Sequence, residues 1–228
     1  MTIEDLKKPL PIESIDFRVQ SVNKGGYATI LAYKDARVDM NRLDEVVGAA
    51  YWKREHFDNN RTCRVSIYNE KIKEWVSKED VGTVSNAEAA KGLASDSFKR
   101  ACFNWGIGRE LYDYPIIKIK LPSNEFKVTP GNNGQKDRVN TTFDFKLKEW
   151  SWFSEFNGDG VLIFLSAKDE KGVARFSYGE LKPSKKVMTD ENFKECDSWT
   201  EANIKAVIKA YELTTEQRKT LDLKLNLK

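Results

Sequence analysis

The fold is decided by residues 78–112, which read KEDVGTVSNAEAAKGLASDSFKRACFNWGIGRELY. Ser85 and Glu88 have the spacing of a capping box, in which a hydroxyl and a carboxylate satisfy the free amides of a helix start. Apolar residues then recur at three- and four-residue steps until Gly106 and Gly108 lower the helix propensity. The pattern predicts a helix from Ser85 to Trp105 with one buried face. That face consists of Ala90, Ala94, Phe98, Ala101 and Trp105.

A neighbouring stripe of the same helix is cationic. Lys91 and Lys99 share this stripe, and Arg100 adjoins Lys99. Asp96 lies one turn before Arg100, the spacing at which a carboxylate orients a cation. Paired cations of this kind contact the phosphates of a nucleic-acid backbone and position it without reading its sequence. The same pair also occurs on ordinary solvated helices, so physical grounds alone leave both interpretations open.

Composition describes a globular chain of 228 residues with 40% hydrophobic and 32% charged residues. This length suffices for one substantial core and a small appendage. The apolar runs are too short to cross a bilayer, and the start, MTIEDLKKPLP, lacks the apolar segment of a signal peptide. We therefore expect a cytoplasmic protein without membrane association. A formal net charge of +3 is too small to indicate a polyanionic partner by itself.

The cysteine count argues against a disulfide framework. Cys63, Cys102 and Cys196 are odd in number and far apart in sequence. That spacing also does not fit a metal knuckle. We expect three reduced, buried thiols.

The first part of the chain, residues 1–121, alternates strand and helix patterns. Strands are predicted at 15–22 and 27–33 around a turn, and at 61–68 and 73–81, with a helix over 37–47 that stops at Gly48. The order is β-β-α-β-β-α. The predicted class is α+β, with the long helix packed on an antiparallel sheet.

The remaining residues divide into three parts. Residues 122–142 are rich in Pro, Gly and Asn without periodicity, which predicts a loop or linker. Residues 143–182 predict an additional β-hairpin unit joined to the core, with strands at 143–148, 161–167 and 174–178 that extend the first sheet. Residues 183–228 predict a small helical C-terminal appendage, with a helix from Thr200 and a shorter one at 216–223.

Signatures of enzymes are mostly missing. There is no GxxxxGK[ST] loop, and His56 is the chain's one histidine and has no partner at metal-ligand spacing. The best enzymatic candidate is Asp159 or Asp169 with Glu180 and Lys182, a loose imitation of the carboxylates and lysine of metal-dependent nucleases. The alternative is a hairpin with charged ends. We predict no cofactor, no metal and no enzymatic activity.

Several motifs resemble one known family. Residues 78–82, Glu88, residues 95–101 and Trp105-Gly106 resemble the EDVG strand and the D-x-x-KRA-x-x-x-[FW]-G helix of the Rad52 family of single-strand annealing proteins. Residues 30–37, 43–48 and 105–112 look closer still to the bacteriophage branch of that family. The resemblance covers residues 15–121 in order and at compatible spacing.

The resemblance implies a β-β-β-α core that assembles into rings or helical filaments around a basic groove for single-stranded DNA. Lys99 and Arg100 match the phosphate-contacting pair of the family, and Asp96 matches a structural acid. Where eukaryotic members have a third basic residue this chain has Phe103, and Arg109 is the candidate to supply that charge. Three residues on or near the first two strands match the family more weakly, and one further lysine lies on the cationic stripe. The expected DNA-binding residues are therefore Lys99, Arg100, Arg109, Arg18, Tyr33, Arg37 and Lys91.

The function implied by the resemblance is ATP-independent binding and annealing of single-stranded DNA in recombination and repair. The resemblance also implies a homo-oligomer from a phage or prophage that works in the bacterial host cytoplasm. The terminal helices are expected either to dock a single-strand-binding protein or exonuclease, or simply to cap the fold. Two other functions remain open, a metal-dependent nuclease and a protein-binding module that keeps this fold without binding DNA.

Overall fold

The computed structural model describes residues 2–83, 89–132, 134–181 and 186–226. It contains two compact units, Met1–Glu180 and Leu181–Lys228. The predicted start of the helical appendage, residue 183, falls two residues after the start of the second unit. The predicted capping box at Ser85 and Glu88 lies outside the described residues.

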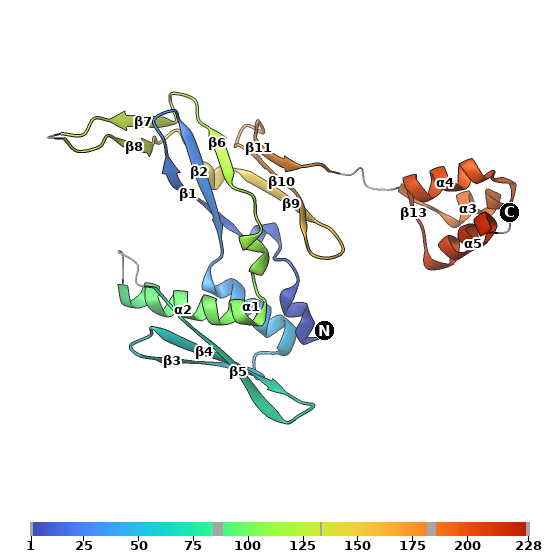
Figure 1. Cartoon of the computed structure of the whole chain (residues 1–228), viewed down its shortest axis with the longest axis horizontal. Coiled ribbons are helices and arrows are strands. Elements are labelled where there is room, and N and C mark those ends of the chain that lie inside the picture. The colour runs from blue at the N-terminus through green and yellow to red at the C-terminus, as the bar shows by residue number, and fades with distance from the viewer. Residues whose placement is uncertain (1, 84–88, 133, 182–185, 227–228) are drawn as a thin grey trace. The chain divides into compact units, whose positions relative to one another are not determined.

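The long helix packs on a three-stranded antiparallel sheet in the first unit (Figure 1). Alternation places Cys63, Val65 and Ile67 on the face toward the helix, where all three are buried. Within this sheet, the helix makes most of its contacts with the strands at residues 62–69 and 74–81. These elements are β3 (Trp52–Phe57), β4 (Thr62–Asn69), β5 (Glu74–Val81) and α2 (Ala89–Trp105).

Strand β3 was missing from the predicted order. Its sequence, WKREHF, carries a charged run that hides the alternation. The strand lies at an edge of the sheet. Among the described strands it pairs with β4, and it exposes Lys53, Arg54 and Glu55. An edge strand tolerates such charges because one side remains in water. The observed order is therefore β-β-α-β-β-β-α.

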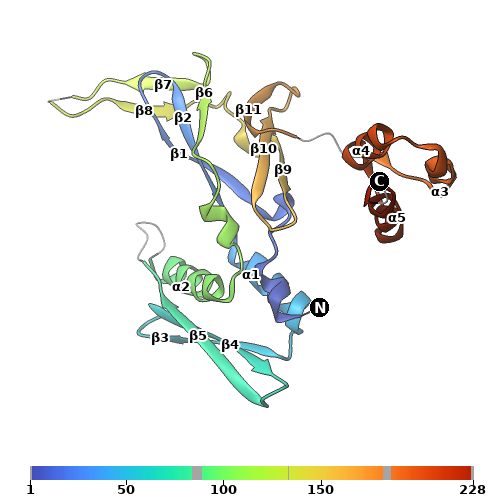
Figure 2. The same cartoon turned by 45° about the vertical axis from the view of Figure 1, so that its right-hand side comes forward.

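A second three-stranded antiparallel sheet has the order β1-β2-β6 (Figure 2). The predicted hairpin and the predicted helix that follows it are confirmed. The helix begins after Asp35, whose side chain accepts the Arg37 amide, and ends at Gly48, where φ is +91°. The elements are β1 (Asp16–Val22), β2 (Tyr27–Tyr33), α1 (Ala36–Val47) and β6 (Ile117–Lys120), with short 3-10 turns η1 (Ile3–Lys7), η2 (Ile12–Ser14) and η3 (Arg109–Tyr112).

A third sheet, of order β11-β10-β9, is separate from the other two. Its strands are β9 (Ser151–Phe156), β10 (Leu162–Lys168) and β11 (Ala174–Gly179). The prediction that this unit extends the first sheet is wrong. Leu165 and Ala167 instead share a buried cluster with Ile30 and Ile119, so the two sheets pack together through their side chains.

The strand predicted at residues 143–148 is also wrong. This segment forms turns and the 3-10 turn η4 (Leu147–Glu149). Phe145 and Leu147 alternate because both are buried in the cluster between the sheets. The alternation therefore reflects burial of a loop rather than strand pairing.

Residues 122–142 contain a two-stranded hairpin where a loop or linker was predicted. The strands are β7 (Phe126–Thr129) and β8 (Arg138–Thr141). Val128 pairs with Val139, and Lys127 pairs with Asn140. The hairpin projects from one end of the β1-β2-β6 sheet (Figures 1 and 2). Its four-residue strands are too short to give a clear periodic signal.

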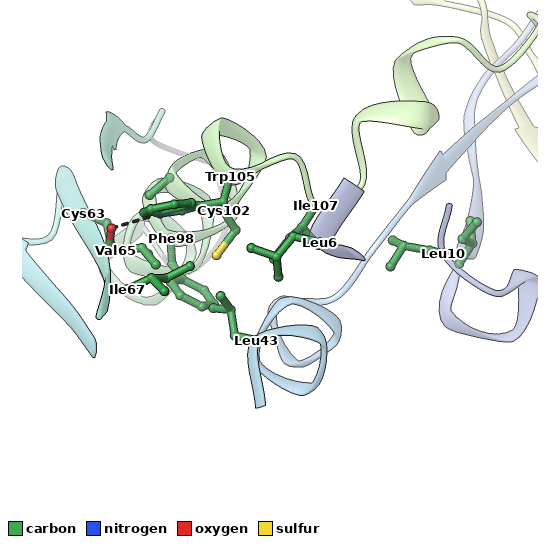
Figure 3. Packing of buried hydrophobic residues seen from close by; sticks show 12 residues of the cluster. Leu6, Leu10, Leu43, Cys63, Val65, Ile67, Phe98, Cys102, Trp105 and Ile107 are labelled. Carbon is green, nitrogen blue, oxygen red and sulfur yellow. Dashed lines mark hydrogen bonds between the residues drawn. The ribbon is translucent and has the colours of Figure 1, made fainter. Parts of the chain in front are cut away.

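The first unit has two main hydrophobic clusters. One surrounds α2 and joins Phe98 and Trp105 to Leu43 of α1 and to Leu6 and Ile107 (Figure 3). The other lies between the β1-β2-β6 and β9-β10-β11 sheets. The long helix is thus fixed by residues from the N-terminal turn, from α1 and from its own sheet.

The second unit is a small helical body. Cys196, Ile204 and Leu221 form its core. The helices predicted at Thr200 and at 216–223 are confirmed, and the Thr200 side chain accepts the Asn203 amide at the first of them. The elements are β12 (Lys186–Val187), α3 (Asp190–Phe193), η5 (Lys194–Ser198), α4 (Glu201–Ala210), β13 (Tyr211–Glu212) and α5 (Thr215–Asn226), with β12 and β13 parallel.

The described cysteines are all free and buried, as predicted. Burial raises the pKa of the Cys63 thiol to about 11 and that of Cys102 well above its ordinary value. Within the described ranges, no helix is long and apolar enough to cross a membrane.

Candidate nucleic-acid interface

A glycine sets the position of α2 against the end of β5. A Cβ added at Gly82 would lie 2.8 Å from the backbone nitrogen of Ser97 and 2.9 Å from the carbonyl oxygen of Leu93. Both atoms belong to the helix backbone and cannot swing away. The Ser97 hydroxyl also donates to the carbonyl of Asn60 at 2.9 Å. The backbone at the end of β5 therefore lies in contact with the backbone of α2. Such a close approach requires glycine at position 82.

The apolar face of α2 fixes which side of the helix meets solvent. Phe98, Ala101 and Trp105 are buried, as predicted. The indole Nε1 of Trp105 donates to the carbonyl of Val65 at 3.0 Å, the dashed line in Figure 3. Because these side chains anchor the helix to β4, the stripe carrying Lys99 faces away from that sheet.

A groove of about 520 Å³ runs between the end of β2 and the C-terminal half of α2. We call it the α2 groove. Tyr33, Lys99 and Arg100 line it, so the structure brings three of the seven predicted residues to one place. Phe103 and Tyr112 line it as well. The groove combines cations with aromatic rings, the two kinds of side chain that bind single-stranded nucleic acids.

Lys99 carries a charge available for a ligand. Within the described part of the chain, its ammonium group has no hydrogen bond or ion pair with another residue. Its charge adds to the hydrogen bonds from Arg37 that lower the pKa of Asp35, and it opposes the burial that raises the pKa of Asp39. An ammonium group that faces an open groove can reach a phosphate without first breaking an internal bond.

Arg100 is oriented by Asp96. Its Nε lies 3.2 Å from a carboxylate oxygen of Asp96, and that same oxygen accepts the amide and hydroxyl of Thr83 at 2.8 and 3.1 Å. Burial acts to raise the pKa of Asp96, but these hydrogen bonds hold it below its ordinary value. Asp96 therefore stays ionised and ties α2 to the segment after β5.

Arg18 and Arg37 lie near the groove but do not line it. The guanidinium carbon of Arg18 lies 5.5 Å from the centre of the Tyr33 ring, a cation–π contact. Arg37 pairs with Asp35 through its Nε at 2.8 Å. This hydrogen bond and the Arg37 amide hold the pKa of Asp35 below its ordinary value. Arg18 thus supports a residue of the groove, whereas Arg37 pairs with Asp35, the residue that caps α1.

Arg109 was expected to add a cation to the DNA-binding site. Its side chain instead caps the C-terminal end of α2. Its Nε donates to the carbonyl of Phe103 at 2.8 Å, and its Nη2 donates to the carbonyl of Asn104 at 2.9 Å. Lys78 donates to the same Asn104 carbonyl at 2.8 Å. Cations at a helix C-terminus satisfy its free carbonyls and oppose its dipole. The backbone of Lys91 lies in α2, but its side chain falls outside the described residues.

A buried ion pair beneath the groove was missed by the sequence interpretation. The ammonium of Lys34 donates to both carboxylate oxygens of Asp39, and both side chains are almost fully buried. Burial raises the pKa of Asp39 to about 6, against the opposing charges of Lys34 and Lys99. Lys34 also lines the groove. The spacing of five residues gave no signal, because it joins a loop to a helix.

The described residues of the nuclease alternative, Asp159, Asp169 and Glu180, belong to no group of three metal-ligating side chains. Asp169 accepts the amides of Lys171 and Val173 and pairs with Arg175 at 3.2 Å, so its carboxylate stabilises the β10-β11 turn. Lys182 lies outside the described residues. In the described ranges no group of three metal-ligating side chains is found.

The site consists of a long helix with paired cations that lines a groove together with the end of β2. A comparison with family models matches residues 2–127 to the Rad52/22 family double-strand break repair proteins, and the chain belongs to that family.

Two curated relatives are similar over 122 residues, half of this chain. Both are single-stranded DNA-binding proteins DdrA, at 32% identity from Deinococcus deserti and 30% from Deinococcus radiodurans. The match covers 60% and 58% of these relatives, so the chain matches about three fifths of their length. No solved structure matches the chain.

Proposed function

We propose that this protein binds single-stranded DNA in the α2 groove and anneals complementary strands without ATP. Lys99 carries the proposal, because its ammonium faces the groove beside Arg100. Family membership and the names of the two relatives support the same ligand. We infer that β3, β4, β5 and α2 form the β-β-β-α core of an annealing protein.

Annealing needs no covalent chemistry. Two strands repel each other through their phosphates, and cations on the backbone reduce this repulsion. Contacts with the phosphates leave the base edges free to sample pairing registers. Lys99 and Arg100 supply such contacts without any nucleotide-binding loop.

We further propose that the protein acts as a homo-oligomeric ring or filament. One groove contributes few phosphate contacts, so a single protomer binds a strand weakly. Repeating the groove along one strand converts weak sites into high avidity. A single-strand-binding protein or exonuclease remains the proposed partner of residues 183–228.

The test is annealing of complementary oligonucleotides without nucleotide or metal. The double variant Lys99→Ala with Arg100→Ala should lose strand binding and annealing while it remains folded and equally oligomeric. The matched control is Lys168→Ala with Lys171→Ala, which removes the same charge from exposed residues outside the groove. Equal losses in both variants, or no strand binding by the parent, would overturn the proposal.

A further inference from the structure

Two aromatic rings in contact with each other line the α2 groove. Phe103 lies on α2 one turn after Lys99, and Tyr112 ends η3. The ring centres are 5.0 Å apart with their planes at 62°, an edge-to-face contact. We propose that Phe103 and Tyr112 form a stacking site for one nucleobase of the bound strand. This inference rests on the proposed function and adds a base contact to its phosphate contacts.

Tyr112 is unusually open for an aromatic residue. It is 76% exposed, although it contacts Phe103 and lines the groove. Aromatic rings bury large apolar areas and dominate cores and interfaces when they are covered. An exposed ring held by a neighbour, next to cations that bind phosphate, offers that area to a ligand.

The ring of Phe103 is held in place by Arg109. The guanidinium carbon of Arg109 lies 5.4 Å from the centre of the Phe103 ring. Arg109 is itself fixed by its bonds to the carbonyls of Phe103 and Asn104. This part of the groove is therefore ordered before any ligand arrives, which lowers the entropy lost on binding.

The spacing between cation and rings suits a nucleotide. Lys99 and Phe103 are four residues apart on one helix face, which corresponds to about 6 Å along the axis. A strand whose phosphate contacts Lys99 thus has a base within reach of the Phe103 and Tyr112 rings. The sugar-phosphate backbone has no flat apolar face, so the rings gain affinity only from a base.

The experiment compares Tyr112→Ala with the parent on two ligands of equal length, oligo-dT and a base-free abasic oligomer. Affinities are measured by fluorescence anisotropy over a range of salt concentrations. Tyr112→Ala should weaken oligo-dT binding about tenfold, the effect of losing one stacked base. Binding to the abasic oligomer and the salt slope should not change. Tyr112→Phe should bind like the parent, because it keeps the ring.

Phe143→Ala is the matched control, since Phe143 is a 90% exposed aromatic outside the groove. It should bind both ligands like the parent. A photocrosslink from 5-iododeoxyuridine in the oligomer to Tyr112 or Phe103, located by mass spectrometry, gives a readout independent of affinity.

Three results would overturn the stacking site. Tyr112→Ala could bind oligo-dT like the parent, it could weaken both ligands equally, or Phe143→Ala could weaken oligo-dT as strongly. Failure of the proposed function looks different, because the parent would then bind neither ligand. Loss of both ligands in Lys99→Ala, with loss of oligo-dT alone in Tyr112→Ala, would support both proposals.

Discussion

Asp96 and Arg100 form an ion pair one helical turn apart, in which the carboxylate also holds the segment after β5 through Thr83. One acid thus orients a groove cation and ties a strand end to α2. Replacing it tests how far the groove depends on that tie.

Asp96→Asn should lower the unfolding free energy at pH 7 by about 1–2 kcal/mol, because charge-assisted hydrogen bonds are lost. The folded pKa of Asp96 lies below the ordinary 3.8, so its stabilisation is present above that pH and is lost as pH falls through the folded pKa. The difference from the parent should therefore shrink below about pH 4. Urea unfolding at pH 7, 5 and 3 measures it, and a difference that is constant with pH would contradict the assignment.

The buried pair beneath the groove gives a second prediction. Asp39→Asn leaves the buried ammonium of Lys34 without its counter-charge and should cost about 3–5 kcal/mol. The double variant Lys34→Met with Asp39→Leu should recover most of this loss, because apolar residues of similar size replace the pair. Urea unfolding of the three proteins provides the comparison. A double variant less stable than Asp39→Asn would show that the pair has a further role.

The carboxyl group of Asp39 should also titrate at an unusually high pH. Burial raises its folded pKa to about 6 from an ordinary 3.8, so the folded state binds the proton more tightly than the unfolded state. Its contribution to the unfolding free energy should fall as pH rises from 3.8 to about 6. Carboxyl carbon NMR of labelled aspartate, assigned with Asp39→Asn, would detect this transition. A midpoint near 4 would contradict the raised pKa.

Gly82 should be intolerant of any side chain. Gly82→Ala places a Cβ 2.8 Å from the backbone of α2, so the helix and the end of β5 must separate. Overpacking of this kind costs about 1–3 kcal/mol. Thermal unfolding should show the loss, and Gly158→Ala, where an added Cβ meets no atom within 4 Å, is the control. Equal melting temperatures for the two variants would refute the close approach.

Arg109 should act on stability more than on strand binding. Arg109→Ala removes two hydrogen bonds to the carbonyls that end α2 and should cost about 1–2 kcal/mol. The slope of log affinity against log salt should stay near that of the parent, whereas Lys99→Ala should reduce it by about 0.7 for one lost phosphate contact. A slope change in Arg109→Ala as large as in Lys99→Ala would restore the original prediction for Arg109.

Local patterns predicted the β1-β2 hairpin, α1, β4, β5, α2, β10 and β11 of the first unit. Alternation at Cys63, Val65 and Ile67 and the helical spacing of Phe98, Ala101 and Trp105 depend on one buried face each, and sequence records such faces directly. Strand β3 was not predicted, because the charged residues of this edge strand interrupt the alternation of apolar and polar residues. The strand prediction for residues 143–148 was wrong because apolar and polar residues alternate in a partly buried loop.

The site was predictable where its residues are neighbours in sequence. Lys99 and Arg100 share a helix stripe, and their place in a groove follows from the buried face opposite. The capping role of Arg109 and the pair of Lys34 with Asp39 depend on backbone carbonyls and burial, which have no sequence signature. Tyr112 could be noted as an aromatic residue, but its exposure comes only from the fold.

The N-terminal segment is tied to residues far along the chain. The amide of Leu10 donates to the carboxylate of Glu110 at 2.7 Å, a hundred positions later, and Leu6 packs in the same cluster as Ile107. Closing a loop of that length costs entropy before any contact forms, and such topologies fold slowly. During synthesis the N-terminal segment therefore cannot complete these contacts until η3 has left the ribosome.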